Sequence, residues 1–144
     1  MFEIRPAKIE DKESIQEVYL SVIGHQANQD GTSWARLIRA GGLLVAEDDG
    51  RIIGFGGIDV QAAEQLKWLY LLPQYQRVGV GSKILRRLEE IGWESGLSLL
   101  RLHSAPLAVE FYRRHGYRTV EPTDLIGHDH EGVEMAKEIM RKDS

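Results

Sequence analysis

One stretch of the sequence decides the fold: Leu69-Tyr70-Leu71-Leu72-Pro73-Gln74-Tyr75-Gln76-Arg77-Val78-Gly79-Val80-Gly81-Ser82-Lys83. Its apolar start predicts a strand that stops at Pro73, and apolar residues recur at helical spacing from Val80 to Ile91. The first N–H groups of a helix lack intrahelical partners and carry positive potential. Gly79 and Gly81 would let a ligand approach those groups, so the loop is suited to a phosphate or pyrophosphate.

Two familiar phosphate loops do not fit this stretch. A P-loop requires Lys-Ser or Lys-Thr after its second glycine, whereas Gly81 is followed by Ser82-Lys83. A dinucleotide-binding fingerprint requires a glycine where Ile84 stands. A tight turn between strand and helix, with no ligand, remains the alternative explanation of the two glycines.

Outward from this loop, turn signals and periodicity predict eleven elements. Strands are expected at 2–5, 43–46, 51–55, 65–72, 97–102, 117–120 and 133–139, and helices at 12–22, 34–39, 80–91 and 106–115. The order β-α-α-β-β-β-α-β-α-β-β, without repeats or an evident linker, predicts one α/β domain over residues 1–144. We expect a mixed sheet with helices on its faces.

Composition restricts the classes of function. The 144 residues are 42% hydrophobic and 28% charged, which is typical of a soluble globular domain. The net charge of −4 argues against a nucleic-acid binder. The absence of cysteine excludes disulfides and a thiol nucleophile and favours the cytoplasm. No apolar stretch approaches the roughly 20 residues that span a bilayer, so no membrane association is expected.

Several motifs resemble one family. The run Gln76-Arg77-Val78-Gly79-Val80-Gly81 resembles the Gln/Arg-x-x-Gly-x-Gly/Ala signature of the GCN5-related N-acetyltransferase (GNAT) superfamily. The run Ala108-Val109-Glu110-Phe111-Tyr112-Arg113-Arg114-His115-Gly116-Tyr117 resembles its Ala-x-x-Phe-Tyr-x-x-x-Gly-Phe segment. Ile4-Arg5-Pro6-Ala7 and Glu134-Met135 resemble its first and last strands, so the similarity covers nearly the whole chain in order.

This resemblance implies a mostly antiparallel, twisted central sheet that splays between its fourth and fifth strands. It also implies acetyl-coenzyme A as cosubstrate, no metal, and direct attack by a primary amine on the thioester. The pantetheine arm would pair with the backbone of Leu69, Tyr70 and Leu71, and an amide near Leu71 would polarise the thioester carbonyl. The pyrophosphate would lie on the amides of Arg77, Val78, Gly79, Val80, Gly81, Ser82 and Lys83.

Tyr112 matches the family's general acid, which protonates the departing thiolate, although packing alone would also explain it. The family's glutamate base aligns with Gln65, and Glu64 is its neighbour. Because adjacent strand residues face opposite sides, Glu64 could act only through a register shift or a water molecule. His103 is a second candidate base. Many members have an asparagine shortly before the Phe-Tyr helix, whereas this stretch reads Ser104-Ala105-Pro106-Leu107, with Ser104 as a candidate substitute. The missing asparagine leaves open a non-catalytic acyl-coenzyme A binding module.

The acceptor is not defined by the motifs: a small-molecule amine and a protein amine both fit. Asp30, in a polar loop from Gly24 to Thr32, is a candidate contact for an ammonium group. The run His128-Asp129-His130-Glu131 is interpreted as a solvated loop rather than a metal site. Trp34 and Trp68 are expected in the core or along the cleft. A homodimer through a strand edge is compatible with the sequence but not required by it.

Overall fold

The computed structural model describes residues 2–23, 32–120 and 132–139. The elements are β1 (Phe2–Pro6), α1 (Lys12–Ile23), α2 (Thr32–Ala40), β2 (Leu43–Asp48), β3 (Arg51–Ile58), β4 (Leu66–Leu71), α3 (Val80–Glu94), β5 (Leu99–Ser104), α4 (Val109–Arg114), β6 (Arg118–Thr119) and β7 (Val133–Glu138). Short 3-10 turns are η1 (Ile9–Asp11), η2 (Pro73–Tyr75) and η3 (Pro106–Ala108). The order predicted from periodicity is therefore confirmed. Asp30 and the run from His128 to Glu131 lie outside the described residues.

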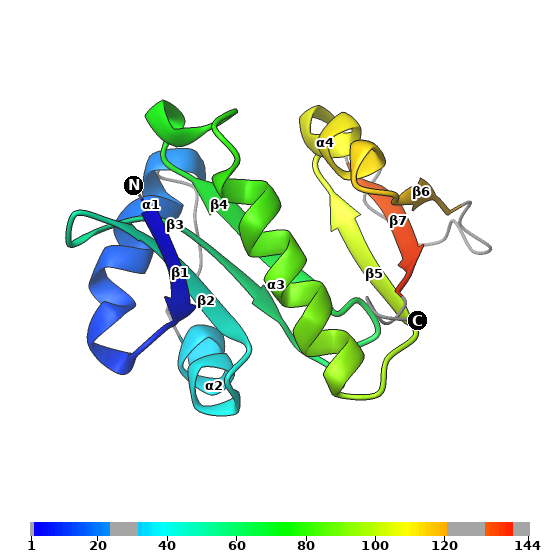
Figure 1. Cartoon of the computed structure of the whole chain (residues 1–144), viewed down its shortest axis with the longest axis horizontal. Helices are drawn as coiled ribbons and strands as arrows, with labels where there is room; N and C mark the ends of the chain where they lie inside the picture. Colours follow the sequence, from blue (N-terminus) through cyan, green and yellow to red (C-terminus); the bar gives the residue numbers. More distant parts are fainter. Residues whose placement is uncertain (1, 24–31, 121–131, 140–144) are drawn as a thin grey trace.

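The strands form two antiparallel sheets rather than one (Figure 1). One sheet has the order β1-β2-β3-β4 and the other has the order β5-β7-β6. Within the described residues β4 and β5 are neighbours that do not form a ladder. This separation confirms the expected splay between the fourth and fifth strands.

Helices cover both faces of the four-stranded sheet. Gly56 and Gly57 are consecutive on β3 and face opposite sides, as strand residues do. A Cβ at Gly56 would contact Ile84 and Leu88 of α3, whereas a Cβ at Gly57 would contact Leu37 of α2. The interior of β3 is consequently buried from Ile52 to Ile58, as expected for a strand covered on both sides.

The helix α3 connects the two sheets. Its apolar stripe, which includes Ile84, Leu85 and Leu88, is buried. At its C-terminal end, Gly92 lies close to Leu100 of β5 and to Ile58 of β3. This close approach places α3 over the gap between the sheets (Figure 1).

Candidate active site

A cleft of about 300 Å³ occupies the gap between β4 and β5. Its walls come from β4 and the segment before it, from β5, from α3, and from η3 and α4. The lining residues are Glu64, Leu66, Lys67, Trp68, Leu69, Tyr70, Leu85, Leu88, Leu102, His103, Ser104, Ala105, Ala108 and Tyr112. The cleft thus contains both catalytic candidates, Tyr112 and Glu64, and two of the three strand residues expected to face the pantetheine arm.

The backbone edge of β4 that faces this cleft is free of strand partners within the described residues. Leu72 N–H donates to the Ile53 carbonyl at 2.9 Å, on the β3 side. Because successive strand residues alternate, the Leu71 N–H points to the opposite, open edge. The predicted position of a polarising amide is therefore compatible with the geometry of β4.

A bulge distorts β4 at the cleft. Trp68 and Leu69 lie opposite the single residue Gly56, and the ladder shifts register there. Trp68 has a φ of 54°, a left-handed conformation that costs a bulky residue about 1–3 kcal/mol. Trp68 lines the cleft, and its ring packs edge-on against that of Trp34, which is fully buried in the core. The two tryptophans thus divide between the two expected locations.

The glycine loop has the geometry that an anion site requires. Arg77 and Gly79 have φ values of 66° and 91°, and Gly79 is the N-cap of α3 without a side-chain cap. The first amides of α3 therefore have no capping partner in the described residues. Arg77, Val78 and Lys83 are exposed around them, so cationic side chains border the loop.

The two loop glycines have different roles. A Cβ at Gly79 would meet nothing within 4 Å, so glycine is needed there for its positive φ. Gly81 is buried, and a Cβ there would lie 3.3 Å from Leu71 and 3.4 Å from Phe111. Gly81 therefore brings α3 close to β4 and α4. The sequence-based explanation, ligand access at both glycines, is too simple for Gly81.

His115 supports the same loop from α4. Its Nδ1 lies 2.7 Å from the Phe111 carbonyl and its Nε2 lies 2.8 Å from the Ser82 hydroxyl. Since a carbonyl only accepts, Nδ1 carries the proton, and a neutral imidazole then accepts from Ser82 Oγ. The first turn of α3 is thereby fixed to the helix that carries Tyr112. Sequence reasoning did not single out His115, because this contact joins residues far apart in the chain.

Tyr112 is half-buried at the wall of the cleft. Its ring contacts Phe111 and Tyr117 edge-on, with centroids 5.2 and 5.7 Å apart. No hydrogen bond engages its hydroxyl within the described part of the chain. Burial raises the pKa of the Tyr112 phenol well above its ordinary value, and the neighbouring Tyr70 raises it further. The phenol therefore remains a proton donor throughout the neutral and moderately alkaline range.

Glu64 lies two residues before β4, which begins at Leu66, one residue after the predicted start. The alternation that would have turned Glu64 away from the cleft therefore does not apply to it. Gln65, the residue aligned with the family's base, has a structural role instead. Its Oε1 accepts from Arg101 N at 2.9 Å and its Nε2 donates to the Ala62 carbonyl at 3.1 Å.

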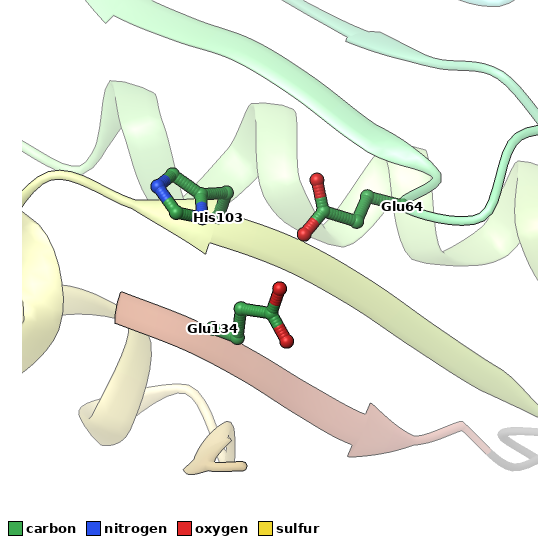
Figure 2. A group of neighbouring side chains, drawn as sticks. All are labelled: Glu64, His103 and Glu134. Carbon is green, nitrogen blue, oxygen red and sulfur yellow. The ribbon is translucent and has the colours of Figure 1, made fainter. Parts of the chain in front are cut away.

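Glu64, His103 and Glu134 form one cluster (Figure 2). His103 on β5 is paired in register with Glu134 on β7, and Glu64 approaches from the segment before β4. One donor atom from each side chain lies within 4.8 Å of the others. Figure 2 shows the carboxyl groups of Glu64 and Glu134 turned toward one another. Both candidate bases are thus brought together, and Glu134 joins them through a strand pairing that the sequence did not reveal.

Comparisons with known proteins identify the class and then the family. Residues 39–119 match the family model described as the acetyltransferase (GNAT) domain, which is the class of protein that the fold resembles. The chain belongs to the GNAT family.

In the described residues, no helix has the length and apolar character needed to cross a membrane.

Two relatives from Bacillus subtilis (strain 168) are similar in sequence. One, provisionally assigned as an acetyltransferase, is 36% identical over 76 residues, which cover 53% of this chain and 47% of the relative. The other, the uncharacterized N-acetyltransferase YjcF, is 31% identical over 62 residues, which cover 43% of this chain and 44% of the relative. The chain thus matches these curated relatives over about half of their length.

Solved structures support the fold. The chain is similar to PaiA N-acetyltransferase from Thermoplasma acidophilum in complex with coenzyme A, with a TM-score of 0.71, 24% identity, and 96% and 99% of the two chains covered. It is also similar to N-acetylglutamate synthase from Neisseria gonorrhoeae complexed with coenzyme A and N-acetyl-glutamate, with a TM-score of 0.80 and 19% identity. That match covers 98% of this chain and 36% of the other.

Proposed function

We propose that the protein is an N-acetyltransferase that transfers the acetyl group of acetyl-coenzyme A directly to a primary amine. The observation that carries this proposal is that an unpaired β4 edge and a protonated Tyr112 line one cleft. The same strand leads along the chain into the glycine loop and the uncapped start of α3. The relatives solved with coenzyme A support the choice of cosubstrate.

The amides from Arg77 to Ser82 would bind the pyrophosphate, whereas the Lys83 N–H already donates to the Gly79 carbonyl at 3.2 Å. His115 would hold the Ser82 hydroxyl in that cradle. The β4 edge at Leu69, Tyr70 and Leu71 would hold the pantetheine arm by strand-like hydrogen bonds. The Leu71 N–H would polarise the thioester carbonyl. The coenzyme A chain would thus run from the loop into the cleft.

In the transfer step the amine nitrogen bonds to the carbonyl carbon and the carbon–sulfur bond breaks. Before attack the ammonium loses one proton to Glu64 and becomes a neutral amine. As the carbon–sulfur bond breaks, Tyr112 gives its proton to the departing thiolate and takes up the second proton, which the nitrogen loses on becoming an amide. Both groups line the cleft, on the β4 side and on α4 respectively. The base that receives the proton of the ammonium and the acid that protonates the thiolate are therefore different residues.

A charge placed in the loop tests this assignment. Val78 is 60% exposed, so Val78→Glu adds a carboxylate beside the expected pyrophosphate without disturbing the core. Gln74→Glu adds the same charge at an exposed residue of η2 and is the matched control. Acetyl-coenzyme A at about 100 times its Kd should stabilise the wild type and the control by about 2.7 kcal/mol, or several degrees.

The Val78→Glu variant should lose this thermal shift. Turnover can be followed by thiol release with a chromogenic disulfide, because a chain without cysteine gives no background. Absence of stabilisation of the wild type would refute the proposal. If Val78→Glu and Gln74→Glu gave equal thermal shifts, the loop would not be part of the coenzyme A site.

A further inference from the structure

A second hollow lies beside the cleft. It has a volume of about 500 Å³ and is lined by Ala62, Ala63, Glu64, Lys67, Arg101, Leu102, His103, Val120, Glu134 and Met135. Glu64, Lys67, Leu102 and His103 line both hollows, so the two share a wall. Along β5, Leu100 and Leu102 are buried, whereas Arg101 and His103 are exposed. Because Leu100 faces α3, the side chains of Arg101 and His103 lie on the face of β5 away from α3.

Hydrogen bonds hold this second hollow, which we call the Glu134 pocket, in shape. Gln65 joins the segment carrying Glu64 to the Arg101 backbone of β5 at 2.9 Å. The same segment is closed by Asp59 N–H, which donates to the Gln65 carbonyl at 2.8 Å. The Asp59 carboxylate is in turn paired with Arg36 of α2 at 2.8 Å. The wall is therefore built by contacts from three elements.

Gly132 leaves room for the ring of His103. A Cβ at residue 132 would overlap the imidazole, so only glycine leaves room for the ring in its observed place. The ring stands beside Glu134, its partner in the β5–β7 ladder. The His103 side chain forms no hydrogen bond among the described residues, so its observed place depends on the space that Gly132 leaves.

The Glu134 pocket is lined by acidic and basic side chains that form no ion pairs with one another among the described residues. Glu64 and Glu134 are clustered with His103, while Lys67 and Arg101 supply two cations to the same walls. In the described part of the chain, the side chains of these five residues form no hydrogen bond or ion pair. Cations and carboxylates that line one hollow without pairing leave space for a ligand that carries both charges.

We propose that the Glu134 pocket is the acceptor site and that it selects amines that also carry an acid group, as amino acids do. This rests on the proposed function, because the shared wall then lies next to the thioester. Glu64 and His103 contact the reacting amine at that wall, and Glu134 adds a second carboxylate contact. Lys67 and Arg101 bind the acid group. A diamine would instead place its second cation against Lys67 and Arg101, which disfavours it.

Matched acceptors test this selectivity. L-lysine, L-ornithine and L-phenylalanine are each compared with the amine that lacks the carboxylate, namely cadaverine, putrescine and phenethylamine. In the wild type, the kcat/KM of the best amino acid should exceed that of its amine by about tenfold or more. The Lys67→Gln/Arg101→Gln double variant should reduce this ratio to about threefold or less, mainly through the KM of the amino acid. Arg86→Gln, an exposed cation on α3, is the control and should keep the ratio.

A binding experiment decides the matter even without turnover. The thermal shift produced by each of the six compounds is measured on the protein saturated with coenzyme A. Greater stabilisation by the amino acids, lost in the double variant, supports the proposal. Equal or greater stabilisation by the amines, or no shift with any of the six, overturns it while the proposed function stands. Failure of acetyl-coenzyme A itself to stabilise the wild type would instead refute the proposed function and the acceptor site with it.

Discussion

Tyr112 is kept protonated by the cleft that surrounds it. Free tyrosine ionises near pH 10, whereas burial and the nearby Tyr70 raise the pKa of Tyr112. A raised pKa means that the folded enzyme retains its acid as the pH rises through 10. Activity should therefore not decline at alkaline pH through ionisation of Tyr112.

We expect Tyr112→Phe to lower kcat by roughly 10²-fold, because the thiolate would leave without a proton donor. The KM for acetyl-coenzyme A should change little, since the ring and its contacts with Phe111 and Tyr117 remain. Tyr75→Phe removes a hydroxyl that is bonded to Asp48 away from the cleft, and serves as control. Steady-state kinetics would assign Tyr112 to packing alone if the loss were below about threefold.

The elements themselves were largely predictable because their signals are local. The Asp49-Gly50 turn between two apolar runs predicted the hairpin of β2 and β3, and the apolar period of 3.6 predicted α3. The side-chain placements at the site depend on contacts between distant segments. Glu64 lines the cleft from a segment that Gln65 attaches to the Arg101 backbone of β5, and Glu134 meets His103 because β7 pairs with β5. Neither follows from periodicity.

The placement of the His103 ring beside β7 can be tested through Gly132, which immediately precedes β7. Gly132→Ala should leave the fold intact, because the overlapping group is a side-chain ring that can rotate away. We expect the displaced His103 to raise the KM for the acceptor by about tenfold while the KM for acetyl-coenzyme A stays constant. In a His103→Ala background the ring is absent, so adding Gly132→Ala should have no further effect. Additive losses in the double variant would show that Gly132 acts independently of His103.

At the scale of the molecule, α3 ties the second sheet to the first. Across the gap between the sheets, Tyr117 Oη donates to Glu89 Oε2 on α3 at 2.8 Å. Lys137 Nζ of β7 donates to the same carboxylate at 3.1 Å. Because no ladder joins β4 to β5 in the described residues, such contacts replace the hydrogen bonds of a continuous sheet. The cleft between β4 and β5 can therefore stay open while the second sheet remains bound to α3.

The stability of this attachment should depend on alkaline pH. Burial raises the pKa of Tyr117, and the charge of Glu89 and the hydrogen bond to it raise it further. The unfolded chain loses this proton near pH 10 while the folded chain keeps it, so the free energy of unfolding should fall above pH 10. The fall should be about 1.4 kcal/mol per pH unit for this group. Below pH 10 the contribution is fully present.

Tyr117→Phe isolates this effect. At neutral pH the variant should be less stable than the wild type by about 1.5–3 kcal/mol, because it lacks a hydrogen bond to a charged acceptor. As the pH approaches about 11, the difference should shrink by about 1.4 kcal/mol, since only the wild type has the tyrosine to ionise on unfolding. Urea unfolding of both proteins across this range measures the difference directly. A difference that stays constant with pH would mean that Tyr117 ionises as easily in the folded protein as in the unfolded chain.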